Sequence, residues 1–110
     1  MFLFFINLVF LFDIFNIHAY NICMWKFSNH IQVRMHERNI SIEEISAIVN
    51  LHINVLIVKS DRDKDIYLYF GRVNQKYILV VVNKSNSNLI TTRRMRKSEI
   101  KVFNQEMKDE

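Results

Sequence analysis

The chain has 110 residues, with 15 Lys and Arg against 11 Asp and Glu, one Cys, one Gly and no Pro. This length allows one small domain and excludes a large multidomain enzyme. A single Cys excludes an intramolecular disulfide framework and a multi-thiolate zinc site. Half of the residues are apolar, too many for a disordered tail, so we expect a domain stabilised by a packed core.

The first 23 residues, called the leader below, differ from the rest of the chain. They are apolar at 18 positions and carry one charged residue, Asp13. A spanning helix needs about 20 apolar residues, and a secretory signal requires Lys or Arg before its apolar run. Three interpretations stay open: sequence upstream of a true start at Met24, an N-terminal membrane anchor, or a cleaved signal. We expect the domain itself to comprise residues 24–110, with a net charge of +5.

The domain begins with two predicted helices. Ser28 is a candidate N-cap for a helix over residues 29–37. Ser41 and Glu44 form a capping box for a second helix that ends near residue 50. The first helix carries a row of basic side chains at spacings of four: His30, Arg34 and Arg38.

After the two helices the apolar period changes to that of strands. Four segments rich in Ile, Val, Tyr and Thr follow, at residues 53–59, 66–70, 77–82 and 89–94. Their connections are too short for parallel crossovers, so they predict an antiparallel meander. Helical spacing then returns at Ile100, Phe103 and Met107. The expected fold class is α+β, with two N-terminal helices, a four-stranded antiparallel meander sheet and a C-terminal helix.

A dense group of positive charges lies where the last predicted strand meets the last helix. Five cations surround a single acid, Glu99: Arg93, Arg94, Arg96, Lys97 and Lys101. Such a density attracts phosphates, although a basic face that only keeps the protein soluble has the same composition. Because alternate residues of a strand face opposite sides, Arg93 and Arg94 cannot both face the core. At least one of them therefore reaches an exposed or ligand-binding face.

Two tyrosines mark one face of the predicted strand 66–70. Tyr67 and Tyr69 lie opposite Ile66, Leu68 and Phe70. A nucleic-acid base stacks well on such aromatic rings. The alternative is that the tyrosines only cover the sheet.

Several runs of residues resemble known small domains. FSNHIQVRMHERNISIEEI (27–45), YFGRV (69–73) and YILVVVN (77–83) resemble a small bacterial family of domains of unknown function, DUF4258. The run ITTRRMRKSEIKVFNQ (90–105) is similar to the C-terminal signature of BrnT toxins, in which paired arginines end a strand and a Glu and an aromatic residue follow in a helix. The matching residues are Arg93, Arg94, Glu99 and Phe103. BrnT is a RelE-like toxin that cleaves RNA and is silenced by a DNA-binding antitoxin, so the resemblance implies a RelE/BrnT-like domain over residues 24–110 and the same activity.

Metal-independent RNA cleavage assigns expected roles to these side chains. Arginines suit the stabilisation of a negative phosphorane, and a histidine near neutral pKa suits proton transfer to or from an oxygen. Glu99 is expected to orient an arginine, to act as base, or only to favour the start of the last helix. The candidate catalytic residues are His30, Arg93, Arg94 and Glu99. The candidate nucleic-acid-binding residues are Arg34, Arg38, Arg72, Arg96, Lys97 and Lys101.

The expected function is a toxin-like endoribonuclease of a toxin–antitoxin system, acting in the cytoplasm on RNA with a nearby antitoxin as partner. No cofactor or metal is expected, because the sequence has no HExxH or paired-carboxylate motif. The first alternative is a non-catalytic module that binds nucleic acid or protein through the same basic surface. The second is a membrane-tethered small protein, which requires the leader to be an anchor.

Overall fold

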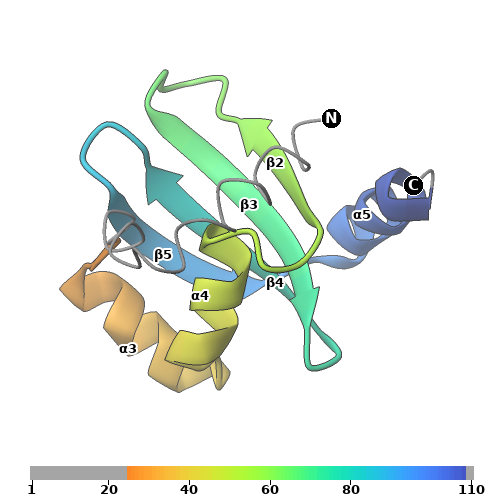
Figure 1. The fold of residues 1–110 in the computed structure, drawn as a ribbon, viewed down its shortest axis with the longest axis horizontal. Coiled ribbons are helices and arrows are strands. Elements are labelled where there is room, and N and C mark those ends of the chain that lie inside the picture. The colour runs from red at the N-terminus through yellow and green to blue at the C-terminus, as the bar shows by residue number, and fades with distance from the viewer. Residues whose placement is uncertain (1–24, 109–110) are drawn as a thin grey trace, which may run out of the picture.

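The computed structural model describes residues 25–108 of the chain. Its elements are β1 (Lys26–Phe27), α3 (Asn29–Arg38), α4 (Ile42–Val49), β2 (Val55–Lys59), β3 (Ile66–Val73), β4 (Lys76–Asn83), β5 (Asn88–Arg94) and α5 (Lys97–Lys108). This order confirms the α+β class, with two helices before the main strands and one helix after them (Figure 1).

The sheet has five strands in the order β1-β5-β4-β3-β2. Strands β2 to β5 pair antiparallel with their sequence neighbours, which confirms the meander. The expectation of four strands is wrong, because β1 adds a fifth strand that pairs parallel with β5 through Lys26 and Phe27. A strand of two residues is too short to show a period of two, so the sequence pattern does not reveal it.

Side-chain caps fix the bounds of the first two helices. The Ser28 hydroxyl accepts a hydrogen bond from the Ile31 N–H at 3.1 Å, and it donates to the Ile90 carbonyl of β5. The left-handed Asn39, with φ of 55°, ends α3. Both bonds of the predicted capping box between Ser41 and Glu44 are present at the start of α4. The caps therefore begin both helices where the sequence predicts.

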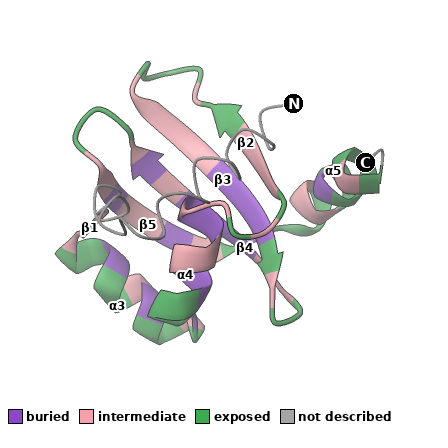
Figure 2. Ribbon diagram, viewed as in Figure 1, coloured by how far each residue is buried: buried purple, intermediate pink, exposed green. Residues whose placement is uncertain are grey.

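The helices cover the two faces of the sheet unequally (Figures 1 and 2). On the first face, α3 and α4 bury Ile31, Ile45 and Ile48 against the strands. On the second face, α5 contributes Phe103 to a smaller core. Gly71 of β3 lies directly under α4, where a Cβ would approach Ile48 Cγ1 to 2.9 Å. The glycine thus permits the close approach of α4 to the sheet.

The leader lies outside the described residues, so the interpretations of it stay predictions. Among residues 25–108, no helix is both long enough and apolar enough to cross a bilayer.

Candidate nucleic-acid interface

The two consecutive arginines at the end of β5 lie on opposite faces of the sheet. Arg93 is paired with Leu79 and Arg94 with Ile78. Leu79 belongs to the core under α5, whereas Ile78 belongs to the core under α3 and α4. Facing residues of paired strands share a face, so Arg93 lies on the α5 side and Arg94 on the α3 side. The two arginines therefore do not converge with the basic row of α3 on one pocket.

Arg93 is held by Glu99 at the start of α5. Its two terminal nitrogens donate to the two carboxylate oxygens of Glu99 at 2.8 and 2.9 Å, and Nη1 also donates to the Arg94 carbonyl. Glu99 further accepts from the Arg96 backbone N–H at 2.8 Å. The bidentate pair joins the end of β5 to the first turn of α5.

The same contacts shift the pKa values of Arg93 and Glu99 so that both stay charged. The hydrogen bond from Arg93 holds the pKa of Glu99 below its ordinary value against the opposing effect of burial, and the Arg96 N–H lowers that pKa further. The hydrogen bond to Glu99 raises the pKa of Arg93. Of the three roles expected for Glu99, the geometry shows two, orienting an arginine and stabilising the helix start. A general base near neutral pH requires a pKa near neutrality, and the shift of Glu99 runs the other way.

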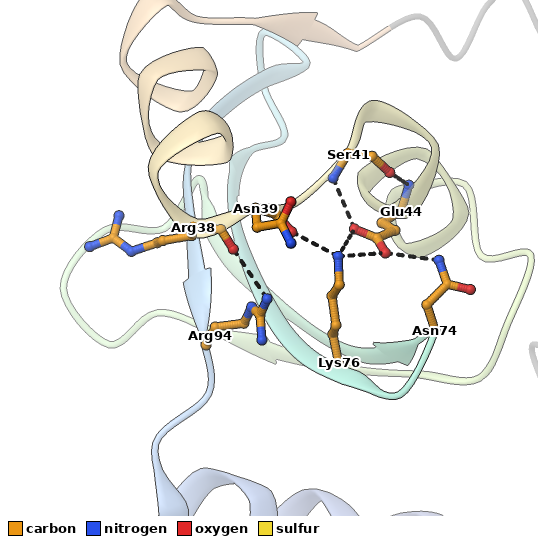
Figure 3. Close-up of polar contacts among 7 residues, drawn as sticks. All are labelled: Arg38, Asn39, Ser41, Glu44, Asn74, Lys76 and Arg94. Atoms are coloured by element: carbon orange, nitrogen blue, oxygen red, sulfur yellow. Dashed lines mark hydrogen bonds and ion pairs between the residues drawn. The ribbon is translucent and has the colours of Figure 1, made fainter.

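Arg94 lies at the C-terminal end of α3. Its Nη2 donates to the backbone carbonyl of Arg38 at 3.2 Å (Figure 3). The last carbonyls of a helix lack intrahelical partners and carry partial negative charge, so a guanidinium is favoured there. The contact brings two predicted residues, Arg38 and Arg94, together across 56 positions of sequence.

The predicted row on α3 forms only in part. Arg34 Nε donates to His30 Nε2 at 3.4 Å, and Arg34 Nη1 pairs with Glu37 at 2.7 Å, a partner that the row did not include. In this contact His30 is the acceptor, through Nε2. It precedes Arg38 by eight residues, about 12 Å along a helix, so His30 lies far from the site of Arg94.

A buried carboxylate, Glu44, fixes the corner between α3 and α4, and only its capping role can be read from the sequence. Glu44 is 3% exposed. It accepts hydrogen bonds from the Ser41 N–H at 2.9 Å, Asn74 Nδ2 at 2.8 Å and Lys76 Nζ at 3.1 Å (Figure 3). Lys76 also donates to the Asn39 carbonyl at 2.7 Å. The network ties the β3–β4 turn to the end of α3, and thus positions Arg38 where Arg94 meets it.

Burial and hydrogen bonding oppose each other at Glu44. Burial alone raises the pKa of the Glu44 carboxyl, but hydrogen bonds from Asn74, Ser41 and Lys76, with the charge of Lys76, lower it below its ordinary value in sum. The group is therefore ionised at neutral pH and paired with Lys76. The capping box reveals Glu44 in the sequence, but its partner 32 residues away carries no local signal.

Arg94 at the end of β5 meets the end of α3 through the Arg38 carbonyl, and Arg96 and Lys97 follow it where the chain enters α5. We call these four cations the junction surface: Arg38, Arg94, Arg96 and Lys97. Three of them are exposed and Arg38 is partly exposed. None forms an ion pair with a carboxylate of residues 25–108. Their positive charge is therefore open to an anionic ligand.

The remaining predicted binding residues lie apart from this surface. Lys101 is exposed one turn further along α5. Arg72 stacks over the Tyr77 ring, with 5.3 Å between its guanidinium carbon and the ring centroid. Tyr77 in turn packs edge-on against Phe103 of α5, so Arg72 belongs to the second face.

The aromatic face of β3 is mostly closed. Tyr69 is 3% exposed, and its ring packs edge-on against Trp25 at 6.4 Å. An open stacking face that includes Tyr69 is therefore wrong, because this side of β3 faces the core under α3 and α4. Tyr67 is only partly buried, with Lys84 Nζ 5.0 Å from the centre of its ring.

No cluster of three or more His, Cys, Asp or Glu suited to a metal ion occurs within the described part of the chain. No curated protein matches the chain, and no protein of solved structure matches it. The sequence model of the family described as "Domain of unknown function (DUF4258)" matches residues 27–94, from β1 to the end of β5. Because this match spans more than half of the sequence, the chain belongs to the DUF4258 family of domains.

Proposed function

We propose that this domain is a non-catalytic RNA-binding module whose junction surface holds phosphate groups. The observation that carries the proposal is that Arg94 meets the end of α3 at the Arg38 carbonyl and that Arg96 and Lys97 follow within three residues of it. None of these four cations is paired to a carboxylate of the described residues. Guanidinium groups bind two phosphate oxygens at once and keep their charge at every relevant pH. Cations placed around a junction suit successive phosphates of one strand.

The geometry favours binding over cleavage. The two terminal nitrogens of Arg93 are engaged by Glu99, and the lowered pKa of Glu99 opposes a role as base. His30 lies about two helical turns from Arg38. Of the two candidate proton-transfer residues, Glu99 is thus paired with Arg93 and His30 lies away from Arg38, which supports binding over cleavage through the 2′-hydroxyl.

The second candidate function is a metal-independent endoribonuclease of a toxin–antitoxin system, with a RelE/BrnT-like fold and a nearby antitoxin as protein partner. What favours it is the order of elements, two helices before an antiparallel meander and one helix after it. The pairing of Arg93 with Glu99 at the positions of the BrnT-like signature supports it further. In this proposal a substrate phosphate displaces Glu99 from Arg93.

RNA binding by the full chain tests the first proposal. We expect a labelled single-stranded RNA to bind with an affinity that falls steeply as salt rises. Replacing Arg96 and Lys97 by Gln should weaken binding and reduce the salt slope by about 1.4, at about 0.7 per lost phosphate contact to a single strand. The matched control replaces Arg62 and Lys64, one exposed Arg and one exposed Lys of the β2–β3 loop, and should leave the slope unchanged.

Each outcome of this experiment separates the proposals. Equal losses in the two double variants would refute the junction surface as the binding site. Cleavage of the RNA in the presence of EDTA, abolished by Arg93→Gln, would replace the binding module by the ribonuclease. Intact RNA with loss of binding only in the Arg96 and Lys97 variant is the expected result.

A further inference from the structure

The outer edge of the sheet at β2 has no partner strand among the described residues. In the order β1-β5-β4-β3-β2, the strand β2 (Val55–Lys59) pairs with β3 alone (Figure 1). Its sequence, VLIVK, is apolar except at its last residue. Because an unpaired edge presents backbone N–H and C=O groups in a row, it can accept another strand.

The register of β2 and β3 shows which residues carry these free groups. The Ser60 N–H donates to the Ile66 carbonyl at 2.9 Å, in the same register as the pairs that Leu56 and Val58 make with β3. In an antiparallel ladder, alternate residues of a strand point both of their backbone groups to the same side. Leu56 and Val58 therefore bond to β3. The other residues of the strand direct their N–H and C=O groups toward the open edge: Val55, Ile57 and Lys59.

A second copy of β2 matches these outward groups. Ile57 is the centre of the five residues of the strand, so an antiparallel copy related by a two-fold axis at Ile57 overlaps the whole strand. Ile57 then lies opposite Ile57, and Val55 lies opposite Lys59. Every outward residue thus meets another outward residue, as the hydrogen-bonded pairs of an antiparallel ladder require.

The side chains of β2 also match in this register. Facing residues of paired strands share a face, so Leu56 of each copy lies beside Val58 of the other. Both residues line a groove of about 250 Å³ that Val102 of α5 lines as well. Val58 is 39% exposed and Val102 is 50% exposed. The pairing therefore covers Val58 and extends the apolar row on the α5 side of the sheet across two molecules.

Lys59 carries the only charge of the strand and restricts the register. A lysine on a strand edge opposes pairing where it meets a second lysine, because like charges that face each other repel. In the register centred on Ile57, each Lys59 lies opposite Val55 at one end of the interface, and the two lysines are about 14 Å apart along the strands. The charge thus permits this register and opposes one that slides the two lysines together.

We propose that two copies of this chain associate edge to edge through β2, as one continuous antiparallel sheet with its two-fold axis at Ile57. The hydrogen bonds of the outward residues fix the register, and burial of Val58 beside Leu56 of the second copy adds apolar contact. The proposal does not depend on RNA binding, because Arg94 of the junction surface lies on β5, which β4 and β3 separate from β2.

Sedimentation velocity of the full chain over a range of concentrations tests the association. We expect a monomer–dimer equilibrium. Val58→Glu should raise its dissociation constant by about tenfold or more, because a charge would then lie against Leu56 of the second copy. The matched control is Val33→Glu, the same change at a valine of α3 that is 53% exposed, and it should leave the constant unchanged. A monomer at every concentration, or equal effects of the two changes, would overturn the proposal.

Cysteine cross-linking tests the register, in a Cys23→Ser background that removes the single native thiol. Ile57→Cys should form an intermolecular disulfide on oxidation, because the Cα atoms of a hydrogen-bonded antiparallel pair lie about 5.5 Å apart, within the range of a disulfide. Lys59→Cys should not, because its counterpart lies about 14 Å away along the strands. Cross-linking of Lys59→Cys that equals or exceeds that of Ile57→Cys would contradict the proposed arrangement.

Amide hydrogen exchange of the unaltered chain keeps the test decisive should a variant fail to fold. The N–H groups of Val55, Ile57 and Lys59 should exchange more slowly at high than at low protein concentration. Those of Leu56 and Val58, which bond to β3, should be protected at both concentrations. Exchange of the outward amides that does not depend on concentration would overturn the proposal, whether it is fast, as at a free edge, or slow, as beneath another segment of the same chain.

Discussion

Replacing the buried carboxylate Glu44 of α4 by Gln should lower the free energy of unfolding more than most other single changes of polar residues in this domain. The side chain of Glu44 is 4% exposed and that of its partner Lys76 is 23% exposed. Removing one partner of a fully buried pair costs about 3–5 kcal/mol, and the partial exposure of Lys76 reduces this to about 2 kcal/mol. The side-chain oxygen of a Gln can still accept the hydrogen bond from the Ser41 N–H. Its amide nitrogen, which takes the place of the second carboxylate oxygen, is a donor and cannot accept from Asn74 or Lys76.

Leaving one of these donors unsatisfied adds about 1 kcal/mol, so the expected total is about 2–3 kcal/mol. Urea unfolding followed by circular dichroism measures this loss, as a fall in midpoint of about 2 M at a slope typical of a small domain. The matched control is Glu43→Gln. Glu43 precedes Glu44 in the same first turn of α4 and is exposed, so the charge near the helix start changes equally while the buried contacts remain.

The same variant has a distinct pH signature. The folded state lowers the pKa of Glu44 below its ordinary value of 4.5, so the folded protein binds this proton less readily than the unfolded chain. The stabilisation is complete above about pH 4.5 and is lost as the pH falls through the folded pKa. Glu44→Gln should therefore flatten the loss of stability in acid. Equal unfolding free energies for Glu43→Gln and Glu44→Gln, or an unchanged acid profile, would refute the network as a source of stability.

Two further predictions concern other contacts of the sheet and its helices. The side chains of Arg93 and Glu99 are 29% and 23% exposed. A double-mutant cycle with Arg93→Gln and Glu99→Gln, measured by urea unfolding, should therefore give a coupling free energy of about 1 kcal/mol. Zero coupling would show that the bidentate contact does not stabilise the fold. Gly71→Ala should lower the free energy of unfolding by about 1–3 kcal/mol through overpacking, because the new Cβ would approach Ile48 Cγ1 to 2.9 Å. An unchanged melting temperature would show that α4 moves away from the sheet without cost.

Local signals predicted the parts of the fold that depend on neighbouring residues. The caps at Ser28 and Ser41 lie where the sequence places them, because an N-cap acts within three residues of itself. Strand alternation likewise predicted that Arg93 and Arg94 face different sides of the sheet. The two-residue strand β1 was missed because its pairing with Asn88 and Leu89 depends on a distant partner and not on any local period.

The site was harder to predict than the fold, because its contacts join residues far apart in the sequence. Glu44 and Lys76 meet across 32 positions, and Arg94 and Arg38 across 56. Spacing rules along one helix predicted the contact of His30 with Arg34, but they also suggested that Arg34 is available, whereas Glu37 occupies it. A basic residue found in the sequence can therefore be proposed as a phosphate-binding residue only once its acidic partners in the fold are known.

The split of the two consecutive arginines separates two tasks within the same short segment. Arg93 turns toward α5, where Glu99 neutralises it and joins the last strand to the last helix. Arg94 turns toward α3, where a backbone carbonyl leaves its charge uncompensated. One guanidinium therefore stabilises the fold and the other contributes charge to the junction surface. Because the two groups lie on opposite faces of one sheet, they cannot bind a single phosphate together. This constraint is the reason why we propose binding along an extended strand and not cleavage at one phosphodiester.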